Sequence, residues 1–476
     1  MASITGSQFF ATDGGTPVVP AYTTDGSGLP APTAGAFNLE VWTGPPGSAP
    51  TSPAPGYQGL AILSNGGEEI TLVSGAFAVS DGGTGDDTIV AQGSDETISG
   101  GSANVTLIVT GTDDVANGGG QDTITVYGFD DTVFGVGNDS ITVFGTGDVI
   151  NAGSGNDTIT VNGTDDTVNG GSGANAMTAT GVGDLVIGGS GPDTVTATGT
   201  RDTIVAGSGA DSITATGNYD QVVAGSGPDT IIVSGFDDTI LGGSGPDTIT
   251  ATGTDELIMG AGGDQTITDN GTDDTIIAGS GADTITATGI YDSITGGTGP
   301  ETITATGTYD VITGGSGAES VTVTGTYDTA NLGSGPDTVD VTGVYDSVTG
   351  GSGPDSISVH GSYDTINAGT GLDTINVFGN SDTVAAGTQG NTTAALVNLS
   401  GHNTTFVDGS NNYSDTVVGF SQSSGDTIHL TGSDTPAYAV ANATPQNGGA
   451  DTLITLNDGS TILLKGVSHI DSSFFS

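Results

Sequence analysis

Short runs of alternating apolar and polar residues recur along the chain from Asp81 to about Gly387. In each run an acid is followed by Thr or Ser, then by Ile or Val, and then by another small polar residue. In residues 193–198, for example, Val195 and Ala197 would point inward while the threonines beside them point outward. An alternation of period two is typical of a short β-strand with one buried face. The pattern therefore predicts many short strands around a thin apolar core.

The alternation belongs to an 18-residue repeat of two nine-residue halves, one built on GSGxD and the other on TGxxD, as in residues 189–223. Nine residues leave room for one strand and one tight corner, so each repeat would form one coil with two strands. We therefore expect an all-β fold, a parallel β-roll that is a two-sided, right-handed β-solenoid. A three-sided β-helix would need longer coils.

Three regions follow from this repeat. Residues 1–80 are rich in Pro and Gly, with short apolar runs at 59–80 that predict entry or capping strands. Residues 81–387 form the roll, with about 17 turns. In residues 388–476 the register is lost, and an Asn457-Asp458-Gly459 hairpin turn between two apolar strands predicts a C-terminal β cap.

Composition narrows the possible partners. The chain has 2 Lys and Arg against 55 Asp and Glu, a formal charge of −53, which excludes nucleic acid and anionic membranes as partners. The absence of cysteine excludes disulfides and thiol catalysis. No run of 18 apolar residues and no N-terminal signal pattern is present, so we expect neither a membrane span nor an ordinary cleaved signal peptide.

The acids of the repeat fall into two rows, one for each half. The first acid row, in the GSGxD halves, is interrupted by Asn175 and Gln265 and consists of Asp87, Asp122, Asp139, Asp157, Asp193, Asp211, Asp229, Asp247, Asp283, Glu301, Glu319, Asp337, Asp355 and Asp373. The second acid row, in the TGxxD halves, begins at Glu96, includes Glu256, and otherwise consists of Asp114, Asp131, Asp148, Asp166, Asp184, Asp202, Asp220, Asp238, Asp274, Asp292, Asp310, Asp328, Asp346, Asp364 and Asp382. A glycine stands three residues before each acid of the second row, so this corner needs an unusual backbone conformation or a close approach.

Stacking carboxylates every ~4.8 Å costs on the order of 1 kcal/mol per pair in water, and several times more in a less polar environment. Cations between the coils would remove this repulsion. Carboxylates and glycine carbonyls are oxygen ligands of flexible geometry, and such a set favours calcium over magnesium or zinc.

The sequences at 82–90 (GGTGDDTIV), 188–196 (GGSGPDTVT), 242–250 and 350–358 resemble the RTX nonapeptide G-G-x-G-x-D-x-U-x, a calcium-binding repeat. The resemblance implies that multiple calcium ions are bound by the first acid row and by glycine carbonyls, which we place at Gly189, Gly191, Gly243, Gly245, Gly351 and Gly353. The second row has one glycine where the nonapeptide has three, so calcium binding there is one alternative and a local Asx-type corner is the other.

Two exposed patterns suggest further roles. In the later repeats the residue before the second-row acid is Tyr291, Tyr309, Tyr327, Tyr345 or Tyr363, which predicts a stacked ladder that stiffens the roll or binds a sugar or partner. Flat Thr-x-Thr-x-Thr rows, as at 248–252 and 302–306, resemble those of ice-binding β-solenoids, although simple β-propensity also explains them.

The RTX resemblance extends to function. The C-terminal segment is similar to that of proteins exported by type I ABC secretion systems, with a final DSSFFS like their uncleaved signals. It implies export from a Gram-negative cell and folding on extracellular calcium. Neither HExxH, GxSxG nor a P-loop occurs, so we expect no enzyme activity. We expect a secreted structural protein that self-assembles by end-to-end stacking into a surface layer, matrix or fibre. An ice-binding or adhesive protein is the alternative.

Overall fold

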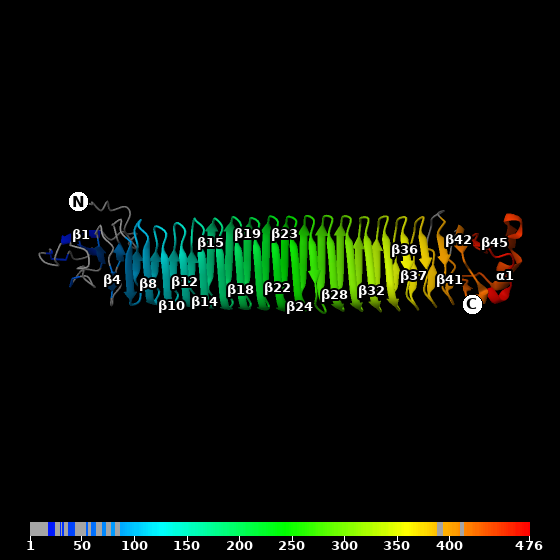
Figure 1. Cartoon of the computed structure of the whole chain (residues 1–476), viewed down its shortest axis with the longest axis horizontal. Coiled ribbons are helices and arrows are strands. Elements are labelled where there is room, and N and C mark those ends of the chain that lie inside the picture. Colours follow the sequence, from blue (N-terminus) through cyan, green and yellow to red (C-terminus); the bar gives the residue numbers. More distant parts are fainter. Residues whose placement is uncertain are drawn as a thin grey trace. The chain divides into compact units, whose positions relative to one another are not determined.

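The structure is a computed structural model that describes residues 18–23, 29, 31–32, 37–42, 54–55, 59–62, 69–72, 78–80, 86–387, 394–409 and 414–476. The chain divides into two compact units, Met1–Ser234 and Gly235–Ser476, and each is described by itself. Strands account for 60% of the residues, and parallel sheets form a β-solenoid of about 19 turns, as expected for an RTX β-roll (Figure 1).

The first unit begins with a small parallel sheet of β1 (Val18–Thr23), β2 (Phe37–Trp42) and β3 (Gly59–Ile62). The strands predicted at 59–80 are present as β3, β4 and β5. Of these, β4 and β5 pair in parallel with β6 and β7 and so continue the two sheets of the roll.

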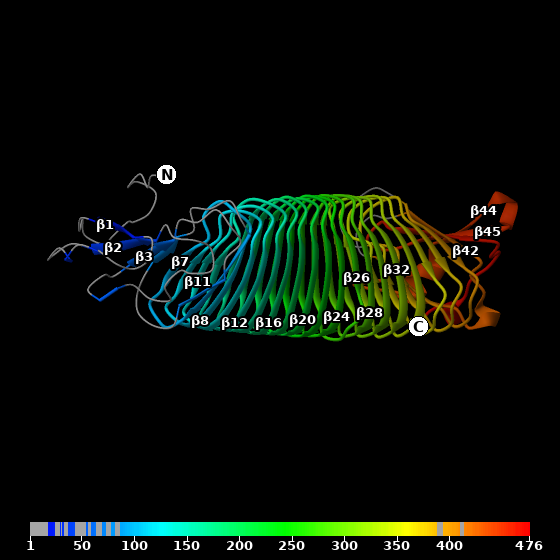
Figure 2. The ribbon, with the colours of Figure 1, turned by 60° about the vertical axis from the view of Figure 1, so that its left-hand side comes forward.

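Each coil of the first unit contributes one strand to each of two parallel sheets. The first sheet contains β4 (Glu69–Leu72), β6 (Asp87–Gln92), β8 (Val105–Thr112), β10 (Thr123–Phe129), β12 (Ser140–Thr146), β14 (Thr158–Thr164), β16 (Ala176–Val182), β18 (Thr194–Thr200) and β20 (Ser212–Asn218). The second sheet contains β5 (Ala78–Ser80), β7 (Thr97–Ser99), β9 (Val115–Asn117), β11 (Thr132–Phe134), β13 (Val149–Asn151), β15 (Thr167–Ser172), β17 (Leu185–Ser190), β19 (Thr203–Ser208) and β21 (Gln221–Ser226). Figure 2 shows β12, β16 and β20 following one another along the first sheet.

The boundary between the two units falls within β22 (Thr230–Phe236), and the second unit has the same arrangement of coils. Its first sheet contains β24 (Thr248–Thr254), β26 (Thr266–Asp269), β28 (Thr284–Ile290), β30 (Thr302–Thr308), β32 (Ser320–Thr326), β34 (Thr338–Val344), β36 (Ser356–Val359), β38 (Thr374–Val377), β40 (Leu396–Leu399) and β42 (Ser414–Val418). Its second sheet contains β23 (Thr239–Ser244), β25 (Leu257–Gly262), β27 (Thr275–Ser280), β29 (Ser293–Thr298), β31 (Val311–Gly315), β33 (Thr329–Gly333), β35 (Ser347–Thr349), β37 (Thr365–Asn367), β39 (Thr383–Ala385), β41 (Thr405–Val407) and β43 (Thr427–His429).

Parallel pairing continues on both sides of the segment in which the 18-residue register is evident. The pair β4 and β5 precedes that segment, and β40 to β43 follow it, with partners spaced 20 or 22 residues apart. These additional coils explain why the solenoid has about 19 turns and not the expected 17.

The register places equivalent residues on top of one another. In the first unit Val195 of β18 pairs with Ile213 of β20, and Ala197 pairs with Ala215. All four side chains are fully buried, and the threonines between them face outward, as the alternation predicts. Each of these two strands therefore contributes two apolar side chains to the core between the sheets.

The regular position of glycine in the TGxxD corners of successive repeats reflects close contact between coils. A Cβ atom at Gly307 would lie 1.7 Å from the carbonyl oxygen of Gly289 in the preceding coil. The predicted close approach is therefore confirmed. The left-handed residue of this corner is the one before the acid, with φ of 58° at Asp165 and 63° at Tyr327.

A C-terminal cap follows the last coil of the second unit. It contains α1 (Pro436–Ala441), β44 (Ala443–Gln446), β45 (Asp451–Thr455) and β46 (Thr461–Lys465), together with the 3₁₀ turns η1 (Gln422–Ser424), η2 (Asn447–Gly449) and η3 (Ser472–Phe474). The predicted hairpin is confirmed, because β45 and β46 are antiparallel and the turn between them contains 457–459. β46 pairs with β42 of the roll, so the cap extends the first sheet.

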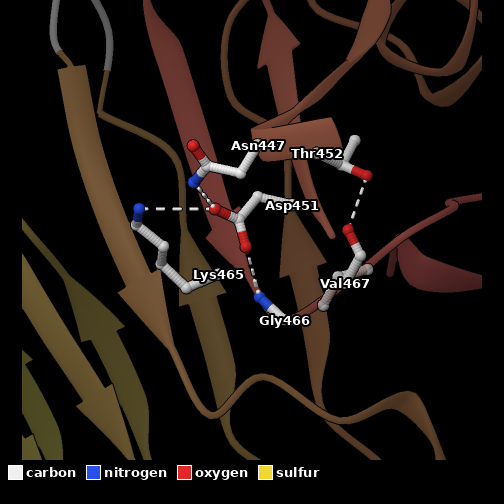
Figure 3. Close-up of polar contacts among 6 residues, drawn as sticks. All are labelled: Asn447, Asp451, Thr452, Lys465, Gly466 and Val467. Carbon is white, nitrogen blue, oxygen red and sulfur yellow. Dashed lines mark hydrogen bonds and ion pairs between the residues drawn. The ribbon is translucent and has the colours of Figure 1, made fainter. Parts of the chain in front are cut away.

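A carboxylate with several donors holds the cap together (Figure 3). Asp451 accepts a hydrogen bond from the Gly466 amide at 2.9 Å, one from the Asn447 side chain, and an ion pair from Lys465 Nζ at 3.3 Å. Thr452 Oγ1 donates to the Val467 carbonyl at 2.7 Å. Among the helices in the described ranges, none has the length and apolarity required to cross a bilayer.

Candidate metal-binding rows

The acids of both rows enter the interior of the roll at its two edges. Asp87 is the first residue of β6, and every other acid stands immediately before a strand, as Asp193 does before β18 and Asp202 before β19. Every acid predicted for the two rows is at most 3% exposed. The rows are therefore columns of buried carboxylates.

One oxygen of these carboxylates joins successive coils. The amide of Asp139 donates to Asp157 Oδ1 at 2.8 Å, and the amide of Thr158 donates back to the Asp139 carbonyl at 2.8 Å. The same ladder links Asp355 to Asp373 at 2.9 Å in the second unit. The carboxylate therefore accepts the backbone amide of the preceding coil at the corner, where, in the part of the chain that the structure describes, no backbone carbonyl of the next coil does so.

The second row has the same ladder. The amide of Asp148 donates to Asp166 Oδ1 at 2.9 Å, and that of Asp328 donates to Asp346 Oδ1 at 3.0 Å. The carboxylates accept amides, as the Asx-type alternative supposed, but the donor lies in the preceding coil. Both corners therefore position a carboxylate in the same way.

The other carboxylate oxygen is buried without a donor in many coils. Among the described residues, Oδ2 has no hydrogen-bond partner in Asp157, Asp211, Asp283, Asp355 and Asp373 of the first row, or in Asp114, Asp131, Asp148, Asp184, Asp292 and Asp310 of the second. A buried charged oxygen without a partner is strongly unfavourable, so a cation or a proton is required there.

Burial raises the pKa of these acids, and neighbouring carboxylates raise it further. The pKa of Asp148 is raised to about 7 by desolvation and then by Asp166 and Asp131, although the Asp131 amide opposes the shift. Desolvation likewise raises the pKa of Asp355 to about 7 and that of Asp202 to about 6. In contrast, the donors around Asp451, first the Gly466 amide, lower its pKa. Among the described residues, Asp148, Asp202 and Asp355 have no positive partner of the kind that Lys465 gives to Asp451.

Gln265 shows what the first corner accepts in place of an acid. Its Oε1 takes the amide of Asp247 at 3.1 Å, as an aspartate oxygen would. Its Nε2 donates to the carbonyls of Gly245 and Gly262, each at 2.8 Å. A partly positive nitrogen therefore lies where two carbonyls converge. A coil with aspartate has no such amide nitrogen, and its carboxylate and carbonyl oxygens form an oxygen-rich set suited to a hard cation.

The six glycines proposed as carbonyl donors all adopt left-handed backbone conformations, with φ between 102° and 147°. Their carbonyls are not equivalent. The Gly351 carbonyl accepts the Thr370 amide of the next coil at 2.8 Å, whereas the Gly245 carbonyl accepts the Gln265 side chain. Of the two glycines, the one nearer the acid (Gly191, Gly245 or Gly353) therefore has the carbonyl that is more available to bind a cation.

Comparison with known families identifies the repeat. The RTX calcium-binding nonapeptide repeat matches residues 79–107, 144–177, 179–213, 187–222, 196–231, 223–255, 232–265, 259–289, 295–330, 346–375 and 361–392. Together these matches cover more than half of the chain. The chain belongs to the RTX repeat family. A search of the curated proteins finds no significant match. The RTX matches coincide with the coils that position the two rows, and they support calcium as the ion.

Several features of the rows were not anticipated. The ladder continues into the C-terminal coils, where the Ala395 amide donates to Asp415 Oδ1 and the Thr404 amide to Asp426 Oδ1, both at 3.1 Å. Their offsets of 20 and 22 residues differ from the 18-residue period, but an acid followed by Thr and an apolar residue at 415–417 and 426–428 could have revealed them. Asp269 was also missed, although it breaks the alternation at a position where neighbouring repeats have alanine.

The residue before each second-row acid points away from the interior. Asp113 and Asp165 are exposed, so they are separated from the buried carboxylates that follow them. The predicted tyrosine ladder is confirmed, because the rings from Tyr291 to Tyr363 stack with centroids 5.1 to 5.2 Å apart.

Proposed function

We propose that the chain is a secreted, calcium-stabilised structural protein. The observation that carries the proposal is the pair of buried carboxylate columns whose second oxygens lack donors in so many described coils. Calcium would supply positive charge between the coils. The first-row acids would bind it with glycine carbonyls, and the second-row acids would bind it mainly through their carboxylates.

Folding and ion binding would be one event. The apolar core of a strand is thin: it consists of one large and one small residue in β20 (Ile213 and Ala215), and of two larger residues in β12 (Ile141 and Val143). Such a core leaves the buried carboxylates uncompensated unless cations are present. A chain that leaves a Gram-negative cell unfolded through a type I ABC exporter would then fold in millimolar extracellular calcium.

A structural role is supported by the extent of the repeats, which occupy most of the chain. Repeats also make the acids equivalent, whereas acid and base catalysis requires acids in different environments. The C-terminal cap covers the last coil, and the edge strand of its sheet is β44, which contains Pro445 and so resists pairing with another strand. Assembly into a layer, matrix or fibre would therefore use surfaces outside this cap. Electron microscopy of calcium-loaded protein tests assembly, and monomers at all concentrations would contradict it.

The decisive experiment is a calcium titration followed by far-UV circular dichroism and by calorimetry. We expect β-structure to form with calcium uptake, with about 14 ions or fewer if one row binds and roughly 30 if both do. Asp355→Asn should reduce the calcium uptake, whereas Asp340→Asn should not, since Asp340 lies on the exposed face of β34. A fully ordered chain in excess chelator at neutral pH would refute the proposal.

An adhesive role is the second candidate, and the tyrosine ladder favours it. Tyr309, Tyr327 and Tyr345 are 45 to 48% exposed, and stacked exposed rings suit the apolar faces of sugars. Glycan arrays with the wild type and Tyr327→Ser test this role. Thermal hysteresis measurements test the ice-binding alternative in the same preparations.

A further inference from the structure

One coil of the second unit carries an acid on the inner face of a strand. Asp269 is the last residue of β26 and pairs with Ala251 of β24 and Ala287 of β28. Its side chain therefore occupies the position of a small core residue, and it is fully buried. Strand β26 ends there, whereas β28 continues for three more residues.

Asp269 faces two acids of the second row. Ligand oxygens of Glu256, Asp269 and Asp274 all lie within 4.8 Å of one another. The three residues are at most 1% exposed. Within the described residues, no N–H or hydroxyl group lies in good hydrogen-bonding geometry to either oxygen of Glu256 or Asp269, or to Asp274 Oδ2. Asp274 Oδ1 is already used by the Glu256 amide at 2.8 Å.

Two departures from the repeat converge at this point. Glu256 is longer than the aspartate usual in its row, and Asp269 replaces alanine in the next coil. The longer side chain of Glu256 extends its carboxylate by one methylene, and Asp269 adds a further carboxylate close to it. Three carboxylates that are buried so close to one another cannot all remain charged without a compensating cation.

We propose that Glu256, Asp269 and Asp274 bind one hard cation, calcium in the extracellular setting, inside the roll. Two ligands of one calcium ion, each about 2.3 to 2.6 Å from it, are at most about 4.6 to 5.2 Å apart, and the 4.8 Å limit on the three oxygens is compatible with this range. The site differs from the nonapeptide sites because it uses a strand residue and contains no residue of the GSGxD corner.

The same coil has lost its acid in the first row. Gln265 stands there, and its amide nitrogen is already bonded to two carbonyls. In this coil Gln265 therefore takes the place of a first-row acid that would bind calcium. The carboxylates of Glu256, Asp269 and Asp274 would bind a cation in the interior of the same coil instead. This inference is independent of any structural or adhesive role of the protein.

Anomalous diffraction from crystals of the full calcium-loaded chain tests the site directly. We expect a peak among the three carboxylates of the wild type, and a peak at the same place after terbium exchange. In Asp269→Ala this peak should vanish, while peaks at the GSGxD corners remain. Ordered carboxylates with no peak between them would overturn the proposal and would indicate shared protons. Peaks at the corners would in that case still support calcium binding by the repeats.

A solution measurement avoids dependence on crystals. The calcium dependence of the unfolding temperature reports the number of ions released on unfolding. In Asp269→Ala this number should fall by one, since alanine is the residue of the neighbouring coils and preserves their packing. Asp340→Ala is the matched control, because it removes an exposed strand aspartate, and its ion number should not change. An equal dependence in Asp269→Ala and the wild type would contradict the site.

Discussion

Each carboxylate of the rows divides two tasks between its oxygens. In Asp157, Oδ1 accepts the Asp139 amide and Oδ2 is buried without a donor. The first oxygen stabilises the stacking of coils, and the second makes that stacking dependent on a bound cation or proton. Asp451 shows the contrast, since three donors surround its carboxylate and no cation is needed.

The raised pKa values predict that acid partly substitutes for calcium. An acid whose pKa is near 7 in the folded chain and near 4 when unfolded favours folding below pH 4. That contribution is lost as the pH rises from 4 to 7. In excess chelator we therefore expect more β-structure at pH 4 than at pH 7 by circular dichroism. A calcium-free chain that loses structure on acidification would contradict the burial of the rows.

Gln265 predicts the effect of restoring an acid. In Gln265→Asp a carboxylate would replace the nitrogen that bonds the Gly245 and Gly262 carbonyls. Without calcium the variant should be destabilised by about 1 to 3 kcal/mol, because the two partly buried carbonyls lose the side-chain amide that bonds both of them. With calcium it should bind one additional ion, as measured by calorimetry. Asp264→Asn, at the exposed neighbouring position, should leave the ion number unchanged. An unaltered ion number in Gln265→Asp would show that the corner carbonyls do not bind calcium.

The tyrosine ladder is an element that stabilises one edge of the second unit. Tyr327 has an unfavourable left-handed backbone, and it stacks on Tyr309 and Tyr345. Replacement by Asn relieves the backbone but removes two stacks worth about 0.5 to 1.5 kcal/mol each. Tyr327→Asn should therefore lower the free energy of unfolding more than Tyr363→Asn, which loses the stack on Tyr345. Equal losses in denaturant titrations would show that stacking contributes little.

The cap depends on a different kind of interaction from the coils. The lowered pKa of Asp451, due first to the Gly466 amide, adds stability above about pH 4 that is lost as the pH falls. Asp451→Asn should accelerate hydrogen exchange in β45 and β46 at pH 7, with a smaller effect near pH 3. Asp471→Asn is the control, since that side chain accepts hydrogen bonds from Ser473 within its own short turn. Equal exchange in both variants would exclude Asp451 as the residue that holds the cap.

The period of the sequence predicted the strands, the two rows and the tyrosine ladder, because identical repeats must stack in register. Asp269 escaped the same reasoning, since a periodic pattern describes the average coil and not its exceptions. The order β42, β46, β45 and β44 in the cap also could not be predicted, because those strands do not repeat. Interaction between Gln265 and the carbonyls depends on backbone directions that residue spacing does not determine.

The whole chain carries a formal charge of −53, but its acids are in two environments. Exposed acids such as Asp113 and Asp165 repel one another through water, and salt screens them over a distance of about 10 Å at 0.1 M. The row acids are buried at both corners, and mobile salt screens buried charges much less. Simple screening therefore cannot replace bound ions.

This difference predicts a selective response to salt. In excess chelator at neutral pH, 1 M sodium chloride should leave the chain without its β-structure, although it screens the exposed acids. Millimolar calcium should restore that structure in the same buffer, because calcium can bind between carboxylates that are stacked about 4.8 Å apart. Circular dichroism in the two buffers makes the comparison, with potassium chloride at equal ionic strength as the control. Folding in sodium chloride alone would show that repulsion among exposed acids, and not the buried rows, prevents the chain from folding without calcium.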